Sequence, residues 1–361
     1  MSTEREPIRA VAARQATSAD LAYQEHILQG VSRTFALTIP ELPADLRCVV
    51  SNAYLLCRIA DTIEDDPALD AHAKRRFSEA FIDVIAGELE AGRFVAELHP
   101  QLSGALLDSE RDLVYNTARV IRITHGFRDR QRAALQRCVR IMSRGMADFQ
   151  QNKSLHGLAT LSHLDRYCYV VAGVVGEMLT ELFCEHCKEM ERHQDELMKL
   201  AVSFGQGLQM TNILKDVWED RARGACWLPR DVFARAGFDV AALGENRGAE
   251  AFRAGLAELI GIARMHLQNA LRYTLLIPAR ERGIRRFCLW ALGMAVLTLR
   301  KIYGHLDYSE GQQVKISRSS VKATVLVTSA SAGQDWLLKL LFELSTRGLP
   351  VSEQGPRGIL V

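Results

Sequence analysis

The sequence lacks the features that mark a membrane-spanning, secreted or nucleic-acid-binding protein. Its longest notable apolar run, residues 287–299, has 13 residues, whereas a membrane-spanning helix needs about 20. The first seven residues are Met-Ser-Thr-Glu-Arg-Glu-Pro, which is charged and contains no apolar signal region. The net charge is only +2, and no Lys/Arg run is long enough for a nucleic-acid patch. We therefore expect a cytoplasmic protein with no nucleic-acid partner, no transmembrane helix and no evident protein partner.

The cysteines also lack the regular spacing of a disulfide framework or a zinc site. The eight cysteines are scattered, mostly within apolar helical patterns, which favours reduced core residues over a disulfide framework. Cys184 and Cys187 form a C-x-x-C pair, but no second pair stands at zinc-site spacing. We treat this pair as a weak metal or redox signal.

Strand patterns are nearly missing. Helical periodicity dominates, and the best strand candidate is the short run 322–328. The polar segment 311–320 is typical of a loop. With 48% hydrophobic residues, the pattern predicts an all-α protein of about ten to twelve helices.

No shift in composition indicates a linker along the 361 residues. We therefore predict a single helical domain at residues 17–349. Residues 1–16 and 350–361 are predicted to be flexible ends. Between these ends, the apolar run 335–344 predicts a helix that docks on the body or touches a membrane surface.

Two acidic clusters of the same design stand out against this background. Because positions i, i+3 and i+4 share a helix face, each D-x-x-E-D cluster would aim three carboxylates the same way. Each follows an apolar stretch, which predicts the C-terminal end of a buried helix, where the helix dipole disfavours anions. Solvated acidic faces are the alternative. The two clusters are Asp61, Glu64, Asp65, followed by Asp66, and Asp216, Glu219, Asp220.

The repetition favours a cation site. Mg²⁺ takes carboxylate oxygens and completes its shell with water and substrate phosphate, so we predict a Mg²⁺–diphosphate site shared between two facing helices. Arg58 lies three residues before Asp61 and could donate forked hydrogen bonds to a diphosphate, or form only a local ion pair. Gln209 and Asn212 share a helix stripe with Asp216 and predict a polar cavity lining.

A mostly apolar segment, residues 167–176, supplies the second part of the pattern. Gly173 and Gly176 would share one helix face and would let a helix or a ligand approach closely. Tyr167 and Phe287 are either core residues or the lining of an apolar chamber. Acidic metal sites beside such a chamber fit ionisation of an allylic diphosphate, because metal ions neutralise the leaving group and a dry pocket protects the carbocation.

The sequence resembles the squalene/phytoene synthase family over about residues 25–320. The segments that carry the resemblance are Ser32-Arg33-Thr34-Phe35, Tyr54 to Asp66, Tyr167 to Gly176, and Gln209 to Asp220. It implies an all-α isoprenoid synthase fold, a single helical domain with a central active-site cavity. It also implies head-to-head condensation of two prenyl diphosphates through a cyclopropylcarbinyl diphosphate.

The resemblance also implies roles for single residues. The six carboxylates of the two D-x-x-E-D clusters match the family's Mg²⁺–diphosphate ligands, for which Mn²⁺ is a second candidate. Tyr167 matches a tyrosine of the first half-reaction, and Phe287 matches an aromatic residue near the second-step cation. Arg58 is expected to act in catalysis and in substrate binding. The other expected substrate-binding residues are Ser32, Arg33, Phe35, Tyr54, Val171, Gln209 and Asn212.

The basic segment Val314 to Arg318 points to the reductive branch of the family. In that branch farnesyl diphosphate is the substrate, squalene is the product and NADPH is the reductant, so Lys315 and Arg318 are expected to contact NADPH. Condensation without reduction, giving dehydrosqualene or phytoene, is the alternative. A non-catalytic homologue that binds prenyl diphosphate is a remote one, because both acidic clusters are intact.

Two departures from the family pattern stand out. Eukaryotic members carry an arginine where Ala225 follows Gly224, and Arg221 or Arg223 is the candidate replacement. Their C-terminal membrane anchor has no counterpart here, so we expect a soluble, bacterial-type member that could rest on the inner face of the membrane. Three further arginines, at 282, 285 and 286, could suit anionic ligands or such a surface.

Overall fold

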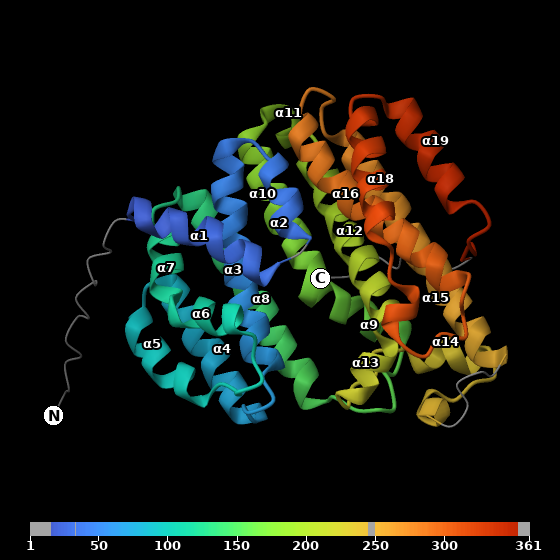
Figure 1. Ribbon diagram of the computed structural model, residues 1–361, viewed down its shortest axis with the longest axis horizontal. Helices are drawn as coiled ribbons and strands as arrows, with labels where there is room; N and C mark the ends of the chain where they lie inside the picture. The colour runs from blue at the N-terminus through green and yellow to red at the C-terminus, as the bar shows by residue number, and fades with distance from the viewer. Residues whose placement is uncertain (1–15, 33, 245–249, 353–361) are drawn as a thin grey trace. The chain divides into compact units, whose positions relative to one another are not determined.

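The computed structural model describes residues 16–32, 34–244 and 250–352 (Figure 1). In these residues the regular elements are all helices, apart from one isolated bridge between Leu158 and Pro229. The predicted all-α class is therefore confirmed. The described residues form nineteen α-helices, more than predicted, because sequence periodicity does not reveal helices of only four residues such as α11 (Lys188–Glu191).

Two local predictions are wrong. The strand candidate 322–328 lies within α18 (Arg318–Ser331), where the Ser317 side chain caps the helix by accepting from the Ser320 amide. Its threonines tolerate the helix because the Thr328 hydroxyl donates to the Thr324 carbonyl, one turn earlier. The predicted loop 311–320 contains α17 (Gly311–Val314) and the start of α18.

The chain divides into two compact units. Unit 1 comprises Met1–Ala36 and Cys48–Ala147, and unit 2 comprises Leu37–Arg47 and Asp148–Val361. The boundaries fall inside helices α2 (Phe35–Thr38), α3 (Ala44–Asp65) and α8 (Asp129–Gln151), so no linker marks them. The single domain at 17–349 stays a prediction, and residues 1–15 and 353–361 of the predicted ends lie outside the described residues.

Unit 1 is held together by a buried polar network around Asn52. The fully buried Asn52 amide donates to the Gln24 side chain and to the Val120 carbonyl, both at 3.0 Å. It also accepts from the Thr124 hydroxyl at 2.7 Å, so α1, α3 and α7 are tied together. The helices of unit 1 are α1 (Ser18–Val31), most of α3 (Ala44–Asp65), α4 (Ala71–Ala86), α5 (Ala91–Leu98), η2 (His99–Gln101), α6 (Asp108–Tyr115), α7 (Thr117–His125) and most of α8 (Asp129–Gln151).

Unit 2 is built around α12 (Gln194–Lys215), which packs most extensively on α15 (Glu250–Leu276) and also contacts α10 (Val174–His186) and α16 (Arg282–Tyr303). The helices α16, α18 and α19 lie together at the C-terminal end of this unit (Figure 1). Besides α11, α17 and α18, its helices are η1 (Ile39–Glu41), α9 (Leu161–Cys168), η3 (Tyr169–Gly173), α10 (Val174–His186), α12 (Gln194–Lys215), α13 (Val217–Ala222), α14 (Arg230–Arg235), η4 (Val240–Gly244), α15 (Glu250–Leu276), α16 (Arg282–Tyr303) and α19 (Asp335–Thr346).

Arg285 is a structural residue of unit 2 and is not available to a ligand. It is 2% exposed. Its guanidinium donates to the carbonyls of Ile277 and Ala332 at 2.8 and 3.0 Å and pairs with Asp335 at 2.6 Å. These bonds join α16, which carries Arg285, to the ends of α15 and α18 and to the start of α19. They also satisfy the buried charge.

One helical stretch among the described residues, Leu161–His186, is long and apolar enough to cross a membrane by length and composition. Of its most apolar 18-residue window, 56% is buried inside the protein. It belongs to unit 2, where η3 and α10 pack against α12.

Candidate active site

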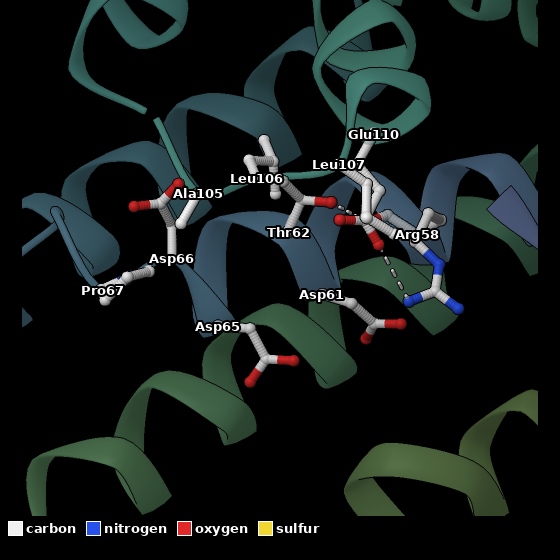
Figure 2. A pocket seen from close by; sticks show the side chains of 10 residues that line it. All are labelled: Arg58, Asp61, Thr62, Asp65, Asp66, Pro67, Ala105, Leu106, Leu107 and Glu110. Carbon is white, nitrogen blue, oxygen red and sulfur yellow. Dashed lines mark hydrogen bonds and ion pairs between the residues drawn. The ribbon is translucent and has the colours of Figure 1, made fainter. Parts of the chain in front are cut away.

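The first acidic cluster occupies the last turns of α3 and opens into a cavity of about 170 Å³. Figure 2 shows the Asp61 and Asp65 side chains pointing to the same side of the helix. This agrees with the i, i+4 spacing of the two carboxylates. The cavity is lined by Arg58, Asp61, Thr62, Asp65, Asp66, Pro67, Ala105, Leu106, Leu107 and Glu110.

Asp61 is the most perturbed carboxyl group of this cavity. Loss of solvent around it raises its pKa to about 7, against the opposing effect of the Arg58 charge. The negative charges of Asp65 and Glu110 add to the rise. A carboxyl group that is this costly to ionise would be stabilised as an anion by a bound cation.

Arg58 lies beside Asp61 and is held by two neighbours. Its Nη2 donates to the Tyr54 hydroxyl at 2.8 Å, and its Nη1 lies 3.8 Å from Glu110. The Tyr54 hydroxyl in turn donates to the Val31 carbonyl at 3.0 Å. The buried Nε of Arg58 has no hydrogen-bond partner within the described part of the chain, so this guanidinium retains a donor for an anionic ligand.

The remaining acidic residues of the first cluster differ from each other. Glu64 does not line the cavity, because positions 64 and 65 lie on opposite sides of position 61 around the helix. Asp66 is 1% exposed and accepts from the amides of Ala68 and Ser103 at 2.8 and 2.9 Å. Asp66 therefore holds the chain after α3.

The Ser32 to Phe35 segment adjoins the start of α2 in unit 1. The buried Ser32 hydroxyl accepts from the Phe35 amide at 2.9 Å. The Phe35 ring packs on Tyr54 with a centroid distance of 5.1 Å. This contact connects the segment to the Arg58 side of the cavity. Arg33, predicted to bind substrate, lies outside the described residues.

The second acidic cluster does not lie on one continuous helix as predicted. Helix α12 ends at Lys215, and Asp216 takes a non-helical conformation with φ −103° and ψ 19°. Glu219 and Asp220 therefore fall in the first turn of α13. A helix N-terminus favours anions, so this break removes the unfavourable placement that the sequence suggested.

Each carboxylate of the second cluster has a partner. The Lys215 ammonium lies 3.1 Å from Asp216, and Arg223 donates to Asp220 at 2.8 Å. Glu219 Oε1 accepts from the Gly311 amide at 2.8 Å, whereas the buried Oε2 has no hydrogen-bond partner among residues that the structure describes. Burial, the largest influence, raises the pKa of Asp216.

Gln209 and Asn212 lie on α12, before the second cluster. Asn212 is exposed and Gln209 is half-buried. The Asn212 carbonyl accepts from the Asp216 amide at 2.9 Å. This backbone bond places Asn212 one helical turn before Asp216. The cavity-lining and substrate-contact roles of Gln209 and Asn212 remain predictions.

Tyr167 is buried in an aromatic stack within unit 2. Its ring lies parallel to Trp227 with centroids 4.1 Å apart, and Phe149 meets it edge-on at 5.1 Å. The chain continues into η3, a π-helical turn that contains Val171. Such turns are frequent at functional sites.

Gly176, one of the two glycines expected to permit the close approach of a helix or a ligand, lies at a helix contact, and so does Gly205 of α12. A Cβ on Gly176 would lie 2.4 Å from the Ala201 carbonyl oxygen. A Cβ on Gly205 would lie 2.4 Å from the Ala172 carbonyl oxygen. Both sites need glycine because η3 and α10 approach α12 backbone to backbone.

The other predicted residues of unit 2 are placed as follows. Phe287 is 6% exposed and packs edge-on against Phe183 with centroids 6.1 Å apart. Lys315 and Arg318 are both exposed, one before α18 and one at its first residue. An anionic cofactor could reach these two side chains from solvent.

The two arginines near Ala225 also have partners. Arg223 is paired with Asp220, and Arg221 donates to the Leu155 carbonyl at 3.1 Å. Arg223 is thus the one that directly contacts the second cluster. Its role as a replacement for the family arginine stays a prediction.

Sequence reasoning missed Glu110 and Gly311. Glu110 contributes a carboxylate to the first cavity from α6, and Gly311 donates to Glu219 across 92 positions of sequence. Neither residue belongs to a motif. Each comes close to an acidic cluster only because segments that are distant in the sequence pack together, so no local pattern could have indicated it.

The donor set fits Mg²⁺ completed by phosphate. Among residues 16–32, 34–244 and 250–352, no three His, Cys, Asp or Glu side chains form a metal-binding group by themselves. Mg²⁺ commonly takes only one or two carboxylates and fills its shell with water and substrate phosphates. Within unit 1, Asp61 and Asp65 line one cavity and meet that requirement. Within unit 2, the Glu219 oxygen without a hydrogen-bond partner among the described residues meets it separately.

The squalene/phytoene synthase family model matches residues 28–320. This match spans both acidic clusters and most of the chain, so the protein belongs to the squalene/phytoene synthase family. The segment resemblance noted in the sequence is thereby confirmed.

Individual relatives refine the comparison. Squalene synthase of Eremothecium gossypii is 30% identical over 290 residues, which cover 80% of this chain and 63% of that protein. Squalene synthase of Dictyostelium discoideum is 29% identical over 324 residues, covering 88% and 72%. Squalene synthase ERG9 of Saccharomyces cerevisiae is 27% identical over 327 residues, covering 88% and 69%. The chain thus spans about two thirds of these relatives' length.

Solved structures show the same fold. The TcSQS complex with BPH1237 has a TM-score of 0.73 at 24% identity and covers 94% of both chains. A dehydrosqualene synthase complex has a TM-score of 0.63 at 21% identity, covering 86% of this chain and 96% of its own. Squalene synthase HpnC of Alicyclobacillus acidocaldarius has a TM-score of 0.55 at 20% identity, covering 81% and 95%. The all-α isoprenoid synthase fold is therefore confirmed.

Proposed function

We propose that this protein is a squalene synthase. In this reaction two farnesyl diphosphates condense head to head to presqualene diphosphate, with loss of one diphosphate and one proton. Presqualene diphosphate then loses its diphosphate and gains a hydride from NADPH to give squalene. The family match across both acidic clusters, together with relatives named squalene synthase, is the observation that carries the proposal.

The acidic clusters are proposed to serve the two ionisation steps. Mg²⁺, when bound, neutralises charge that develops on a leaving diphosphate. Asp61 and Asp65 would hold it at the first cluster, and Asp216, Glu219 and Asp220 at the second. The partner-free Nε of Arg58 supports a direct hydrogen bond from Arg58 to diphosphate oxygen.

Two aromatic residues are proposed to act on the hydrocarbon part of the substrate. The stack with Trp227 fixes the Tyr167 ring, which supports a positioned hydroxyl for proton removal in the first half-reaction. Phe287 offers a buried ring face that could stabilise the second-step carbocation through its quadrupole. Val171, Gln209 and Asn212 complete the proposed substrate contacts in unit 2.

Lys315 and Arg318 are proposed to contact the phosphates of NADPH. Their exposure supports this role, because a soluble cofactor must reach them. NADPH supplies the hydride when bound. The two side chains would provide only binding and orientation.

A product assay tests the function. The purified protein is incubated with farnesyl diphosphate and Mg²⁺, with and without NADPH, and the lipids are identified by mass spectrometry. We expect squalene only when NADPH is present. Dehydrosqualene with or without NADPH would instead support the second candidate, which the fold similarity to a dehydrosqualene synthase favours. A parallel incubation with geranylgeranyl diphosphate distinguishes phytoene formation.

We also propose a peripheral contact between α18–α19 and an anionic membrane surface. Trp336, Leu340 and Leu344 are 67%, 47% and 54% exposed, and their i, i+4, i+8 spacing forms one stripe of α19. On α18, Leu326 is 72% exposed. A surface with such apolar side chains commonly contacts a partner or a lipid phase.

The charges near this stripe favour anionic lipid as the partner. Arg318, Lys322, Lys339 and Arg347 are exposed, and Glu343 is the exposed acidic residue beside Leu344. The other acidic residue of α19, Asp335, is already paired with Arg285, so basic side chains predominate. Basic residues flanking a Trp/Leu face are typical of interfacial helices. Vesicle co-sedimentation tests this contact. Phosphatidylglycerol-containing vesicles should retain the wild-type protein, and L340S/L344S should lose binding; retention of that variant would contradict the proposal.

A further inference from the structure

The segment after α16 runs back onto the second acidic cluster. We call residues 304–315 the strap. Trp218 Nε1 donates to the Tyr308 carbonyl at 2.7 Å, and the Tyr308 hydroxyl donates to the Leu214 carbonyl at the end of α12. Lys301 Nζ donates to the Lys315 carbonyl at 2.6 Å. The strap is therefore held along its length by bonds to α12, α13 and α16.

The strap is also buried where it crosses the cluster. Tyr308 is 4% exposed and Val314 is fully buried. The rings of Tyr308 and Trp218 meet edge-on with centroids 6.5 Å apart. Buried side chains and satisfied backbone groups together give this segment one defined position.

Glu219 is the residue of the second acidic cluster that the strap contacts. Its Oε1 accepts from the Gly311 amide at 2.8 Å. Its Oε2 is buried and has no hydrogen-bond partner within the described residues. A buried carboxylate oxygen without a partner is costly, so one oxygen of Glu219 is fixed while the other remains for a cation.

Only glycine fits at position 311. A Cβ there would lie 2.8 Å from Glu219 Oε1 and 3.1 Å from Oε2. It would also lie 2.9 Å from the Lys215 carbonyl oxygen, a backbone atom that cannot simply rotate away. Any side chain at 311 must therefore displace the Glu219 carboxylate or the strap itself.

We propose that Gly311 is a positioning residue for the second acidic cluster. Its amide holds Glu219 by one oxygen and so presents the other to Mg²⁺ and diphosphate. This inference rests on the proposed metal role of Glu219. It adds a residue outside the acidic motif and assigns the strap the task of aligning a metal ligand.

Thermal unfolding of the full-length protein tests the proposal without an activity readout. The melting temperature is measured while Mg²⁺ is titrated at fixed inorganic pyrophosphate. A ligand that binds only the folded state raises the melting temperature. We expect the Mg²⁺ midpoint of Gly311→Ala to rise by about tenfold relative to wild type, the size typical of lost support for a metal ligand.

Matched variants separate positioning from stability. Gly304→Ala is the control glycine of the strap, because its Cβ would meet atoms no nearer than 3.5 Å; its midpoint should equal that of wild type. Glu219→Gln keeps an oxygen for the Gly311 amide, so its melting temperature without Mg²⁺ should stay near wild type while the Mg²⁺ response weakens. Tyr308→Phe removes the hydrogen bond to the Leu214 carbonyl without adding an atom near Glu219. It should also raise the Mg²⁺ midpoint, and it tests the positioning role if Gly311→Ala does not fold.

The outcomes distinguish the two proposals. Wild-type midpoints in Gly311→Ala and Tyr308→Phe, with a normal wild-type response, would overturn the positioning role alone. A lower melting temperature with an unchanged Mg²⁺ midpoint would show that Gly311 serves only the fold and would also overturn it. If wild type itself does not respond to Mg²⁺ and pyrophosphate, the metal role of the cluster fails together with this inference.

Discussion

At the scale of single residues, the surroundings move the pKa of two aspartates in opposite directions. Hydrogen bonds from Arg122, the largest influence, hold the pKa of Asp20 at about 2. Burial raises the pKa of Asp61 to about 7 even though Arg58 is adjacent. Asp20 is thus a stable structural anion, whereas Asp61 is only partly ionised near neutral pH and would be stabilised as an anion by a bound cation.

Tyr167 provides a residue-scale prediction. Tyr167→Phe keeps the ring that stacks on Trp227 but removes the hydroxyl proposed for proton removal. We expect formation of presqualene diphosphate to slow by about 10²-fold or more, the usual size of a lost acid–base contribution. Mass spectrometry of single-turnover reactions measures this, with the melting temperature as the folding control. An unchanged rate would remove Tyr167 from the mechanism.

His266 predicts a pH dependence of stability. Burial lowers its pKa to about 4 from 6.5, and its Nδ1 is hydrogen-bonded to Ser203 at 2.8 Å. Because the unfolded chain takes up the proton first, this neutral histidine supports the fold above pH 6.5. That support decreases as the pH falls from 6.5 towards 4.

The matched variant is His266→Gln, which cannot titrate. Between pH 7.5 and 5.5, the free energy of unfolding of wild type should fall by about 1.4 kcal/mol more than that of the variant. Urea unfolding at both pH values measures the difference. Equal decreases in the two proteins would show that folding does not lower the pKa of His266.

At the scale of elements, close packing of α12 against η3 and α10 determines which helix positions are glycine. Gly205→Ala would place a Cβ 2.4 Å from the Ala172 carbonyl oxygen and 2.7 Å from the Gly173 amide nitrogen. We expect it to destabilise the protein by about 1–3 kcal/mol, as overpacking usually does. Thermal unfolding measures the loss.

Gly304→Ala serves again as the control for this packing prediction. Gly304 caps the end of α16 and has room for a methyl group. Its stability should stay within about 0.5 kcal/mol of wild type. A similar melting temperature for Gly205→Ala would mean that η3 can move away from α12 at little cost.

At the scale of the whole molecule, the two acidic clusters belong to different compact units. If both serve one reaction, Asp61→Asn and Asp216→Asn should each reduce turnover by about 10²-fold or more. The double variant should then be little worse than either single variant, because groups that act together are not additive. Multiplied losses would indicate two independent contributions. Initial rates with farnesyl diphosphate, and unchanged circular dichroism, provide the test.

The sequence predicted the all-α class correctly, but two of its local predictions differ from the structure. Periodicity does not show that α12 ends at Lys215, and so it placed Glu219 at a helix C-terminus instead of in the first turn of α13. The run 322–328 was predicted as a strand because β-branched residues prefer strands. In the structure this preference is overridden, because Ser317 caps α18 and the helix packs on α16.

The sequence by itself determined the all-α class, the two acidic clusters and the family, because these depend on residue order and periodicity along the chain. The tertiary structure decided which side chains act beside them. Glu110 reaches Arg58 from another helix, Asp66 accepts hydrogen bonds that hold the chain after α3, and Gly311 meets Glu219 from 92 positions away. Such contacts arise only when distant segments pack, and burial then sets the charge that each carboxylate can carry.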